Sequence, residues 1–118
     1  MSAPRDETVY LHHMLDAARK IQDGVGGRSR EGYDSDFYFR MGIAHLIQII
    51  GEAARCVSED VRNSIPEIPW KQVTGMRHRI VHDYINIDFD VVWDTATIDV
   101  PVLITALTAA LVRRDITD

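Results

Sequence analysis

The fold is decided by residues 36–57, which read DFYFRMGIAHLIQIIGEAARCV. Apolar side chains recur in this stretch every three or four residues, the spacing that places them on one face of an α-helix. They are Phe39, Ile43, Leu46, Ile50, Ala53 and Val57. The opposite face is also apolar in part, since it carries Met41, His45, Ile49 and Cys56. A helix that is apolar on two sides needs two packing partners, so we expect a second copy of the chain to be one of them.

Helical spacing also dominates the rest of the chain, and strand-like alternation is nearly absent. Residues 8–22 form the first expected helix, because the glycine-rich run 24–27 cannot continue it at low cost. A connecting loop over residues 23–35 follows. Further along, a bend that contains two prolines leads into a third expected helix, which starts at Pro69 and ends near Asn86.

The C-terminal part of the chain adds a last helical region over about residues 89–114. Pro101 interrupts this region, so we expect a kink or a break near Asp99. Short connections between consecutive helices favour antiparallel neighbours. The sequence therefore predicts an all-α fold, an antiparallel bundle of four to five helices in a single domain over residues 1–118.

The composition is that of a globular protein, with 46% apolar and 26% charged residues in 118. One cysteine, Cys56, excludes an internal disulfide and a cysteine-built zinc site. No apolar stretch approaches the roughly 20 residues of a membrane span, and the first residues lack the apolar segment of a signal peptide. We therefore expect a cytoplasmic protein with no membrane partner.

The charge is acidic overall but uneven along the chain. The net charge of −5 excludes a broad basic surface for nucleic acid, so any phosphate binding must be local. Residues 55–82 hold five cations against three acids, whereas residues 83–100 hold five aspartates and no lysine or arginine. The cations are Arg55, Arg62, Lys71, Arg77 and Arg79. Apart from Arg77, these cations either guide RNA to a site or are simply solvated.

The stretch richest in chemical groups is GMRHRIVHDY, residues 75–84. On a helix that turns by about 100° per residue, Arg77 falls in the middle of an apolar stripe. The stripe consists of Val73, Ile80, Val81 and Tyr84. Burying an unpaired guanidinium is costly, so we expect an anionic group to meet Arg77. His78 and His82 flank the arginine on one side, and Tyr84 returns to within about 20° of it.

These groups suit a phosphodiester. Arginine presents a planar fork of donors to phosphate oxygens. A histidine can take the proton of a ribose 2′-hydroxyl or return one to the leaving oxygen. Together they could cleave RNA without a metal, with positive charge stabilising the transition state. The competing interpretation is structural: Arg77 pairs with a carboxylate of another helix, and the histidines cap a helix end.

A metal site is the other alternative, because His78 and His82 have the i, i+4 spacing of two zinc ligands on one helix. The metalloprotease helix, however, has a glutamate directly after its first histidine, and here Arg79 occupies that position. Arg77 and Arg79 would also repel a divalent cation. We therefore expect neither a metal nor a cofactor.

With its surroundings, this stretch resembles the HepT branch of the HEPN superfamily, small all-α proteins of which many are ribonucleases. The motif of that branch is an arginine, four residues, a histidine, one residue and a tyrosine, and Arg77, His82 and Tyr84 match it. His78 fills a slot that usually holds another polar residue, often asparagine. Similar blocks are IIGEAA at 49–54, PEIPW at 66–70, and Val92-Trp93 with the later Pro101. The likeness covers roughly residues 8–112.

The resemblance implies a homodimer that cuts RNA in a composite site where two motif helices meet. It assigns catalysis to Arg77 and His82, with His78 as an assisting group. It further implies a type VII toxin–antitoxin pair, in which a cognate MntA-like minimal nucleotidyltransferase transfers AMP to Tyr84. The added group would put bulk and negative charge beside the arginine. Glu52 either holds Arg77 in place or makes an ordinary interhelix salt bridge.

Two other functions fit the same residues. A non-catalytic helical module that binds and regulates a nucleotidyltransferase suits the net charge of −5, although such a module has no need for both Arg77 and His82. A phosphate or nucleotide sensor that uses the same arginine is a further alternative.

Overall fold

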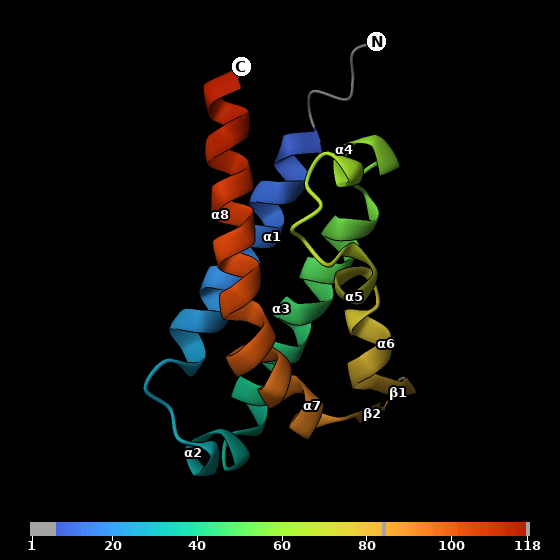
Figure 1. Ribbon diagram of the computed structural model, residues 1–118. Helices are drawn as coiled ribbons and strands as arrows, with labels where there is room; N and C mark the ends of the chain where they lie inside the picture. Colours follow the sequence, from blue (N-terminus) through green and yellow to red (C-terminus); the bar gives the residue numbers. More distant parts are fainter. Residues whose placement is uncertain (1–6, 84, 118) are drawn as a thin grey trace.

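The computed structural model describes residues 7–83 and 85–117, the last three of these by their backbone alone. Its fold is all-α, with one small hairpin. The core is built by α1 (Thr8–Val25), α3 (Phe37–Arg55) and a long C-terminal helix. That helix consists of α7 (Phe89–Asp94), a π-helical turn (Thr95–Asp99) and α8 (Val100–Thr117). α1 lies between α3 and α8 and packs against both (Figure 1).

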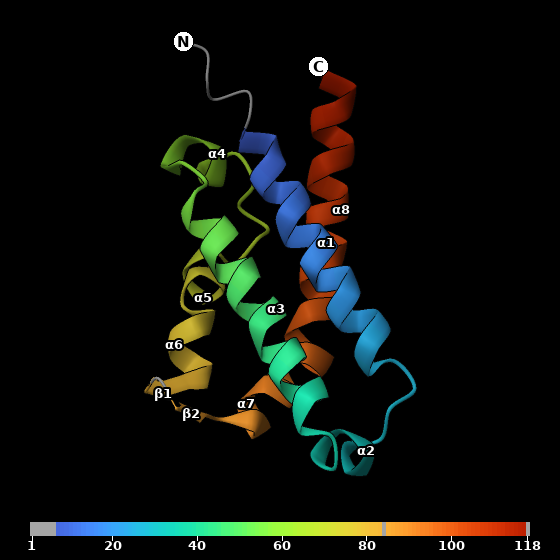
Figure 2. The same ribbon diagram turned by 180° about the vertical axis from the view of Figure 1, so that it is seen from behind.

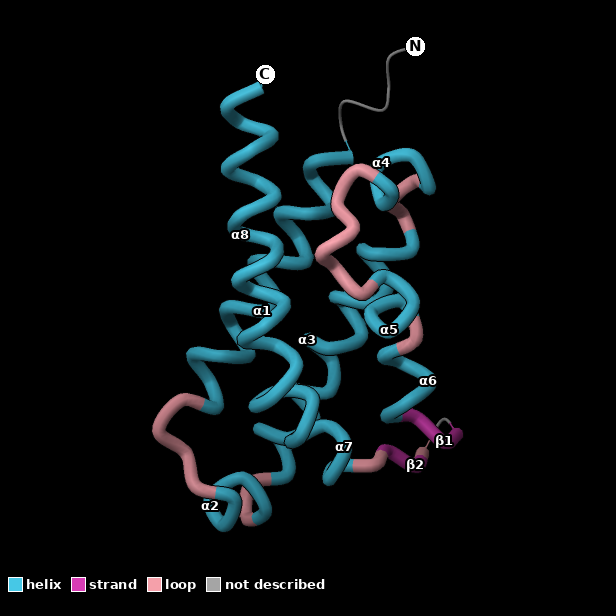
Figure 3. Tube along the Cα trace, in the orientation of Figure 1, coloured by secondary structure: helices cyan, strands magenta, loops and turns pink. Residues whose placement is uncertain are grey.

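Short elements fill the connections between the long helices (Figure 3). α2 (Arg30–Asp34) joins α1 to α3, and α4 (Glu59–Asn63) follows α3. α5 (Trp70–Thr74) and α6 (Met76–Ile80) then pack along α3, on the side away from α1 (Figure 2). β1 (Val81–Asp83) and β2 (Asn86–Ile87) form an antiparallel hairpin that leads into α7.

The core confirms the helical periodicity of the sequence. On α1, Leu11, Met14, Ala18 and Ile21 are fully buried at intervals of three or four residues. α3 buries Ile43, Ile47, Ile50 and Ala54 in the same way. Each set occupies one face of its helix, and the two faces meet in one continuous apolar cluster. Burial of these faces is the main source of the stability of such helices.

The expected loop after α1 is shorter than predicted and contains a helix. α1 runs to Val25 and ends where Gly27 adopts a φ of 80°, a conformation that favours glycine. Ser29 then caps α2 by accepting a hydrogen bond from the N–H of Gly32. Tyr33, although it lies on this short helix, is completely buried. Contacts with the core therefore stabilise a helix that has no periodic signal of its own.

The third expected helix is wrong in its extent. It is divided at Gly75 into α5 and α6, and it ends at Ile80 rather than near Asn86. The segment after Ile80 pairs with itself instead, since Val81 lies opposite Ile87 and Asp83 opposite Asn86. The expected helix is therefore interrupted twice, at Gly75 and after Ile80.

The C-terminal helix has the irregularity expected near Asp99. Pro101 has no N–H to donate to the carbonyl one turn earlier, and its ring crowds that carbonyl. The helix responds by widening into the π-helical turn Thr95–Asp99 and then continues as α8. It is neither broken nor ended at this point.

Within the described part of the chain, one helix, Phe89–Arg114, is long and apolar enough to cross a membrane, judged by length and composition alone. This finding corrects the expectation that no stretch approaches that length. The core helix of a soluble protein meets the same criterion. The inner face of this helix belongs to the core through Val92, Ala96, Val100, Leu103 and Leu107.

Candidate active site

The polar groups of the motif lie on the outer side of α6. This helix is one and a half turns long, and it is anchored by Met76 and Ile80, which are both buried in the core. The three residues between them, Arg77, His78 and Arg79, are exposed. Because residues i and i+4 share a helix face, anchoring Met76 and Ile80 turns the intervening side chains outward. The sequence Met-Arg-His-Arg-Ile thus builds a cationic surface on an apolar anchor.

The predicted burial of Arg77 in an apolar stripe is therefore wrong. The stripe assumed one continuous helix from Val73 to Tyr84, but Val73 lies on α5 and Val81 on the hairpin. A constant angle per residue relates side-chain directions only within one continuous helix. Two breaks, at Gly75 and after Ile80, separate Val73 from Val81. Arg77 is exposed and has no hydrogen bond or ion pair with any described residue. In the single chain its guanidinium is free to bind an anion.

His82 lies on β1, the first strand of the hairpin, which follows α6 directly in the chain. Asp83 fixes the turn, because its carboxylate accepts hydrogen bonds from the N–H groups of Ile85 (2.9 Å) and Asn86 (3.0 Å) and from the Asn86 amide (2.8 Å). These bonds, that of the Asn86 side chain above all, lower the pKa of Asp83. Tyr84 lies outside the described residues, between Asp83 and the exposed Ile85.

His82 faces a carboxylate that the sequence analysis did not single out. Its Nε2 lies 3.6 Å from Oδ2 of Asp88, an ion-pair distance. The other carboxylate oxygen of Asp88 caps α7, accepting from the N–H groups of Asp90 and Val91 at 3.1 Å each. The backbone N–H of Asp88 donates to the carbonyl of Ile80 at 2.7 Å, which closes the base of the hairpin. Asp88 thus holds its position independently of His82.

The same bonds keep Asp88 ionised. The hydrogen bond from the Val91 N–H lowers the pKa of Asp88 most, and the Asp90 N–H and His82 add to the effect against partial desolvation. A capping signal was available in the sequence, since Asp88 immediately precedes the apolar residues of α7. What the sequence could not reveal is that the hairpin folds His82 back toward that cap.

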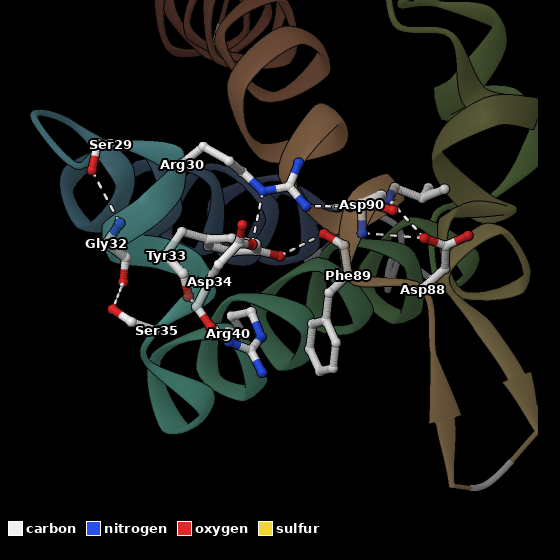
Figure 4. A network of polar contacts seen from close by, with 11 residues as sticks. Ser29, Arg30, Gly32, Tyr33, Asp34, Ser35, Arg40, Asp88, Phe89 and Asp90 are labelled. Carbon is white, nitrogen blue, oxygen red and sulfur yellow. Dashed lines mark hydrogen bonds and ion pairs between the residues drawn. The ribbon is translucent and has the colours of Figure 1, made fainter.

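A polar network holds the start of α7 in place (Figure 4). The guanidinium of Arg30 lies between the carboxylates of Asp34, at 2.8 Å, and Asp90. The hydroxyl of Tyr33 donates to the carbonyl of Phe89 at 2.7 Å. α2 is thereby tied to the first turn of α7, directly beside Asp88. The network supports the site through the position of α7.

Among the described residues, Glu52 neither holds Arg77 in place nor forms an interhelix salt bridge. It lies in a hollow of about 420 Å³ between α1 and α3, together with Tyr10, His13, His45 and Cys56 among others. It makes no ion pair with Arg77, nor with any other cation in the part of the chain that the structure describes. α3 carries Glu52 on the face turned toward α1, whereas α6 packs elsewhere on α3.

The two histidines of the metal alternative are not on one helix. His78 lies on α6 and His82 on β1, so the i, i+4 helical spacing that suggested a pair of zinc ligands does not exist. Among residues 7–83 and 85–117, no three histidine, cysteine or carboxylate side chains gather closely enough to hold a metal ion.

The helical fold and the exposed arginine and histidine, five positions apart on α6 and the hairpin, define a protein of the HEPN class. Within it, the chain belongs to the family described as Ribonuclease HepT-like, which matches residues 14–110. The prediction of this family from the motif is confirmed. Ribonuclease activity is the function that the family supports.

Relatives with this function in their names span nearly the whole chain. A "Putative RNase" of Caldanaerobacter subterraneus subsp. tengcongensis is 29% identical over 103 residues, which are 87% of this chain and 89% of the relative. A "Probable ribonuclease HepT" of Thermococcus cleftensis is 29% identical over 99 residues, 84% of this chain and 90% of the relative. Among solved structures, none matches the chain at a significant level.

Proposed function

We propose that this protein is a cytoplasmic, metal-independent endoribonuclease, the toxin of a type VII toxin–antitoxin pair. The observation that carries the proposal is the arrangement around α6. Arg77 and His78 are exposed without partners among the described residues, and His82 on the adjoining strand faces an ionised carboxylate. A free guanidinium can bind a phosphodiester, and an imidazole with a fixed carboxylate partner can move a proton.

In the proposed reaction the ribose 2′-oxygen attacks the adjacent phosphorus. His82 accepts the 2′-hydroxyl proton, and a protonated imidazole returns a proton to the leaving 5′-oxygen. Arg77 binds the phosphate and stabilises the charge that develops on its oxygens, with His78 assisting. Asp88, whose Oδ2 lies 3.6 Å from Nε2 of His82, keeps the imidazole ring oriented. The products are a 2′,3′-cyclic phosphate, or the 3′-phosphate formed from it, and a 5′-hydroxyl.

The proposed active form is a homodimer in which both copies contribute their motifs. Large apolar side chains that a single chain leaves in solvent support it. Ile85 beside the hairpin, with Ile98 and Val102 on the C-terminal helix, are 72%, 62% and 65% exposed. A second copy of the chain that packed on these side chains would remove their apolar surface from water. A clean monomer in light scattering at micromolar concentration would contradict the dimer.

The proposed antitoxin is a minimal nucleotidyltransferase that transfers AMP to Tyr84. The exposed positions on either side of this tyrosine, Asp83 and Ile85, support access of an enzyme to the turn. An adenylate at this point would bring negative charge to the hairpin next to Arg77. Intact mass of the protein, incubated with the cognate enzyme and ATP, should rise by one or more AMP units. An unchanged mass would end this part of the proposal.

The direct test incubates purified protein with total RNA in the presence of EDTA. Wild type should cleave, and His82→Ala should not. His12→Ala, which removes an exposed histidine of α1, is the matched control and should cleave like wild type. End-group analysis should find cyclic or 3′-phosphates. Ends with a 3′-hydroxyl would contradict the 2′-oxygen mechanism, and loss of activity in EDTA would contradict its independence of metals.

Expression in cells separates the nuclease from the non-catalytic module that regulates a nucleotidyltransferase. The nuclease should arrest growth, and the arrest should disappear in His82→Ala. Harmless overexpression of the wild type would favour the module instead.

A further inference from the structure

A second cationic surface adjoins α6 on the side of His78. It is a hollow of about 430 Å³ formed where the end of α3, α4 and the junction between α5 and α6 come together. The residues that line it are Arg55, Arg62, Thr74, Gly75 and His78. His78 directly follows the motif arginine in the chain, so the hollow and the proposed catalytic surface share the helix α6.

The charged groups that line this hollow are all basic. It contributes two guanidinium groups and an imidazole, and no carboxylate is among the described residues that form it. In a chain with 18 acids and 13 lysines and arginines, such a surface stands apart from its surroundings. A concave surface lined by charges of one sign concentrates counter-ions of the other sign.

Both arginines are held by backbone carbonyls and not by acids. Nη2 of Arg55 donates to the carbonyl of Thr74 at 3.4 Å, and Nη2 of Arg62 donates to the carbonyl of Ala54 at 3.0 Å. The Arg62 guanidinium also lies over the Trp70 ring, 5.7 Å from its centre. Each bond fixes a guanidinium through one of its five N–H donors and leaves its charge unneutralised.

One of these donors is buried without a partner. Nε of Arg62 is inaccessible to solvent and makes no hydrogen bond with the described residues. A buried charged donor normally finds an acceptor, because leaving it unpaired costs free energy. Arg62 keeps this orientation although one of its donors is unsatisfied, because the Ala54 carbonyl and the Trp70 ring hold its guanidinium at the hollow.

We propose that Arg55, Arg62 and His78 form a binding site for a phosphate of the RNA backbone that neighbours the phosphate to be cut. This inference rests on the proposed ribonuclease function. An RNA strand carries one such phosphate per nucleotide, so a strand bound at Arg77 must place further phosphates on the adjoining surface. Contacts of this kind fix the register of a strand without reading its bases. The site would therefore position substrates of any sequence.

The test measures binding separately from cleavage. A fluorescent 2′-O-methyl oligonucleotide lacks the attacking hydroxyl, so its binding to the His82→Ala protein can be followed by anisotropy at several salt concentrations. Arg55→Gln, added to that protein, should weaken binding roughly tenfold at low salt. It should also lower the slope of log affinity against log salt by about 0.7, the contribution of one phosphate contact on a single strand.

Arg19→Gln is the matched control, because it removes the same charge from an exposed position on α1 that does not line the hollow. It should change neither quantity appreciably. Arg55→Lys, which retains the charge but not the planar fork, should restore the slope and only part of the affinity. Thermal unfolding of each variant shows that it is folded. We choose Arg55 for substitution because the partly buried Arg62 also packs on Trp70.

Equal effects of Arg55→Gln and Arg19→Gln would overturn the inference and leave the proposed function standing, since cleavage by wild type is measured independently. The binding measurement is repeated with free AMP as a second ligand. If free AMP binds the wild-type hollow as tightly as the oligonucleotide does, and Arg55→Gln abolishes both, the site recognises a nucleotide and not the RNA backbone.

Discussion

At the scale of single residues, the pair His82 and Asp88 carries the most specific chemistry. Asp88 uses one oxygen for the cap of α7 and presents the other to the imidazole at 3.6 Å. The carboxylate is only about one-third exposed, whereas the imidazole remains largely open to solvent, with 65% of its side chain accessible. Such a pair combines a rigid orienting group with a reactive group that a substrate can reach.

Replacement of Asp88 by asparagine should separate these two roles. Asparagine caps helices as well as aspartate does, so the thermal stability near pH 7 should change little. The ionised oxygen that faces Nε2 of His82 is replaced by a neutral amide, so the imidazole loses its orienting partner. We expect kcat to fall roughly tenfold, since orientation of a general base is only part of its contribution.

Asp94→Asn is the control for this prediction, because Asp94 is an exposed residue of the same helix with no contact to His82. It should leave both kcat and the melting temperature unchanged. A purely structural role of Asp88 would lower the melting temperature together with kcat, and this result would contradict the orienting role.

At the scale of elements, α2 and α7 act as a pair. α2 has only five residues, too few for an independent helix, and it owes its position to the burial of Tyr33 and to the ion pairs of Arg30 with Asp34 and Asp90. The Tyr33 ring packs on Trp93 with a centroid separation of 4.8 Å. The first turn of α7, and with it Asp88, is thus fixed from the side opposite the hairpin.

Tyr33→Phe should weaken this connection without affecting the chemistry. It removes the hydrogen bond to the Phe89 carbonyl, and we expect a loss of about 1 kcal/mol in the free energy of unfolding. Burial raises the pKa of Tyr33 to about 12, so the hydroxyl continues to donate in mildly alkaline solution. Denaturant unfolding at pH 7 and pH 9 should therefore give the same loss.

Tyr10→Phe is the comparison for this variant, since the Tyr10 hydroxyl has no hydrogen bond to the described residues. It should be nearly neutral. If Tyr33→Phe proved equally neutral, α2 would be held by packing and ion pairs alone.

The elements also differ in how well the sequence predicts them. α1, α3 and the C-terminal helix each repeat their apolar spacing over several turns, so their existence and the effect of Pro101 could be predicted. α2, α6 and each strand of the hairpin span at most five residues. Their boundaries depend on tertiary contacts, such as the burial of Tyr33 and the Asp88–Ile80 backbone bond, which no periodicity encodes.

This limit also explains which features of the candidate site could be predicted from the sequence. The motif spacing of Arg77 and His82 could be recognised because it is a local pattern. The exposure of Arg77 and the partner of His82 could not, because both depend on where α6 ends and the chain turns back. Asp83 and Asp88, which determine that turn and the following cap, act through hydrogen bonds over two to six residues and leave no periodic signal.

At the scale of the whole molecule, the carboxylates that stabilise the fold share one property. Asp36, Glu67, Asp83 and Asp88 all have a lowered pKa. In Asp36 the main cause is the hydrogen bond from the Phe39 N–H at the start of α3, and in Asp83 it is the Asn86 side chain. Glu67 also forms an ion pair with Arg113 near the end of α8. Ionised carboxylates thus support α3, the hairpin, α7 and α8 together.

This distribution predicts loss of stability in acid. Each carboxyl binds its proton less readily in the folded than in the unfolded chain, so protonation favours unfolding. The stabilisation is fully present above the ordinary pKa of about 4 and is lost as the pH falls through the lower folded values. Melting temperatures from circular dichroism should therefore stay level from pH 7 to pH 5 and decrease below about pH 4. Asp36→Asn, which retains a capping group but cannot ionise, should reduce the size of that decrease. A decrease already complete between pH 7 and pH 5 would instead identify histidines as the groups that control stability.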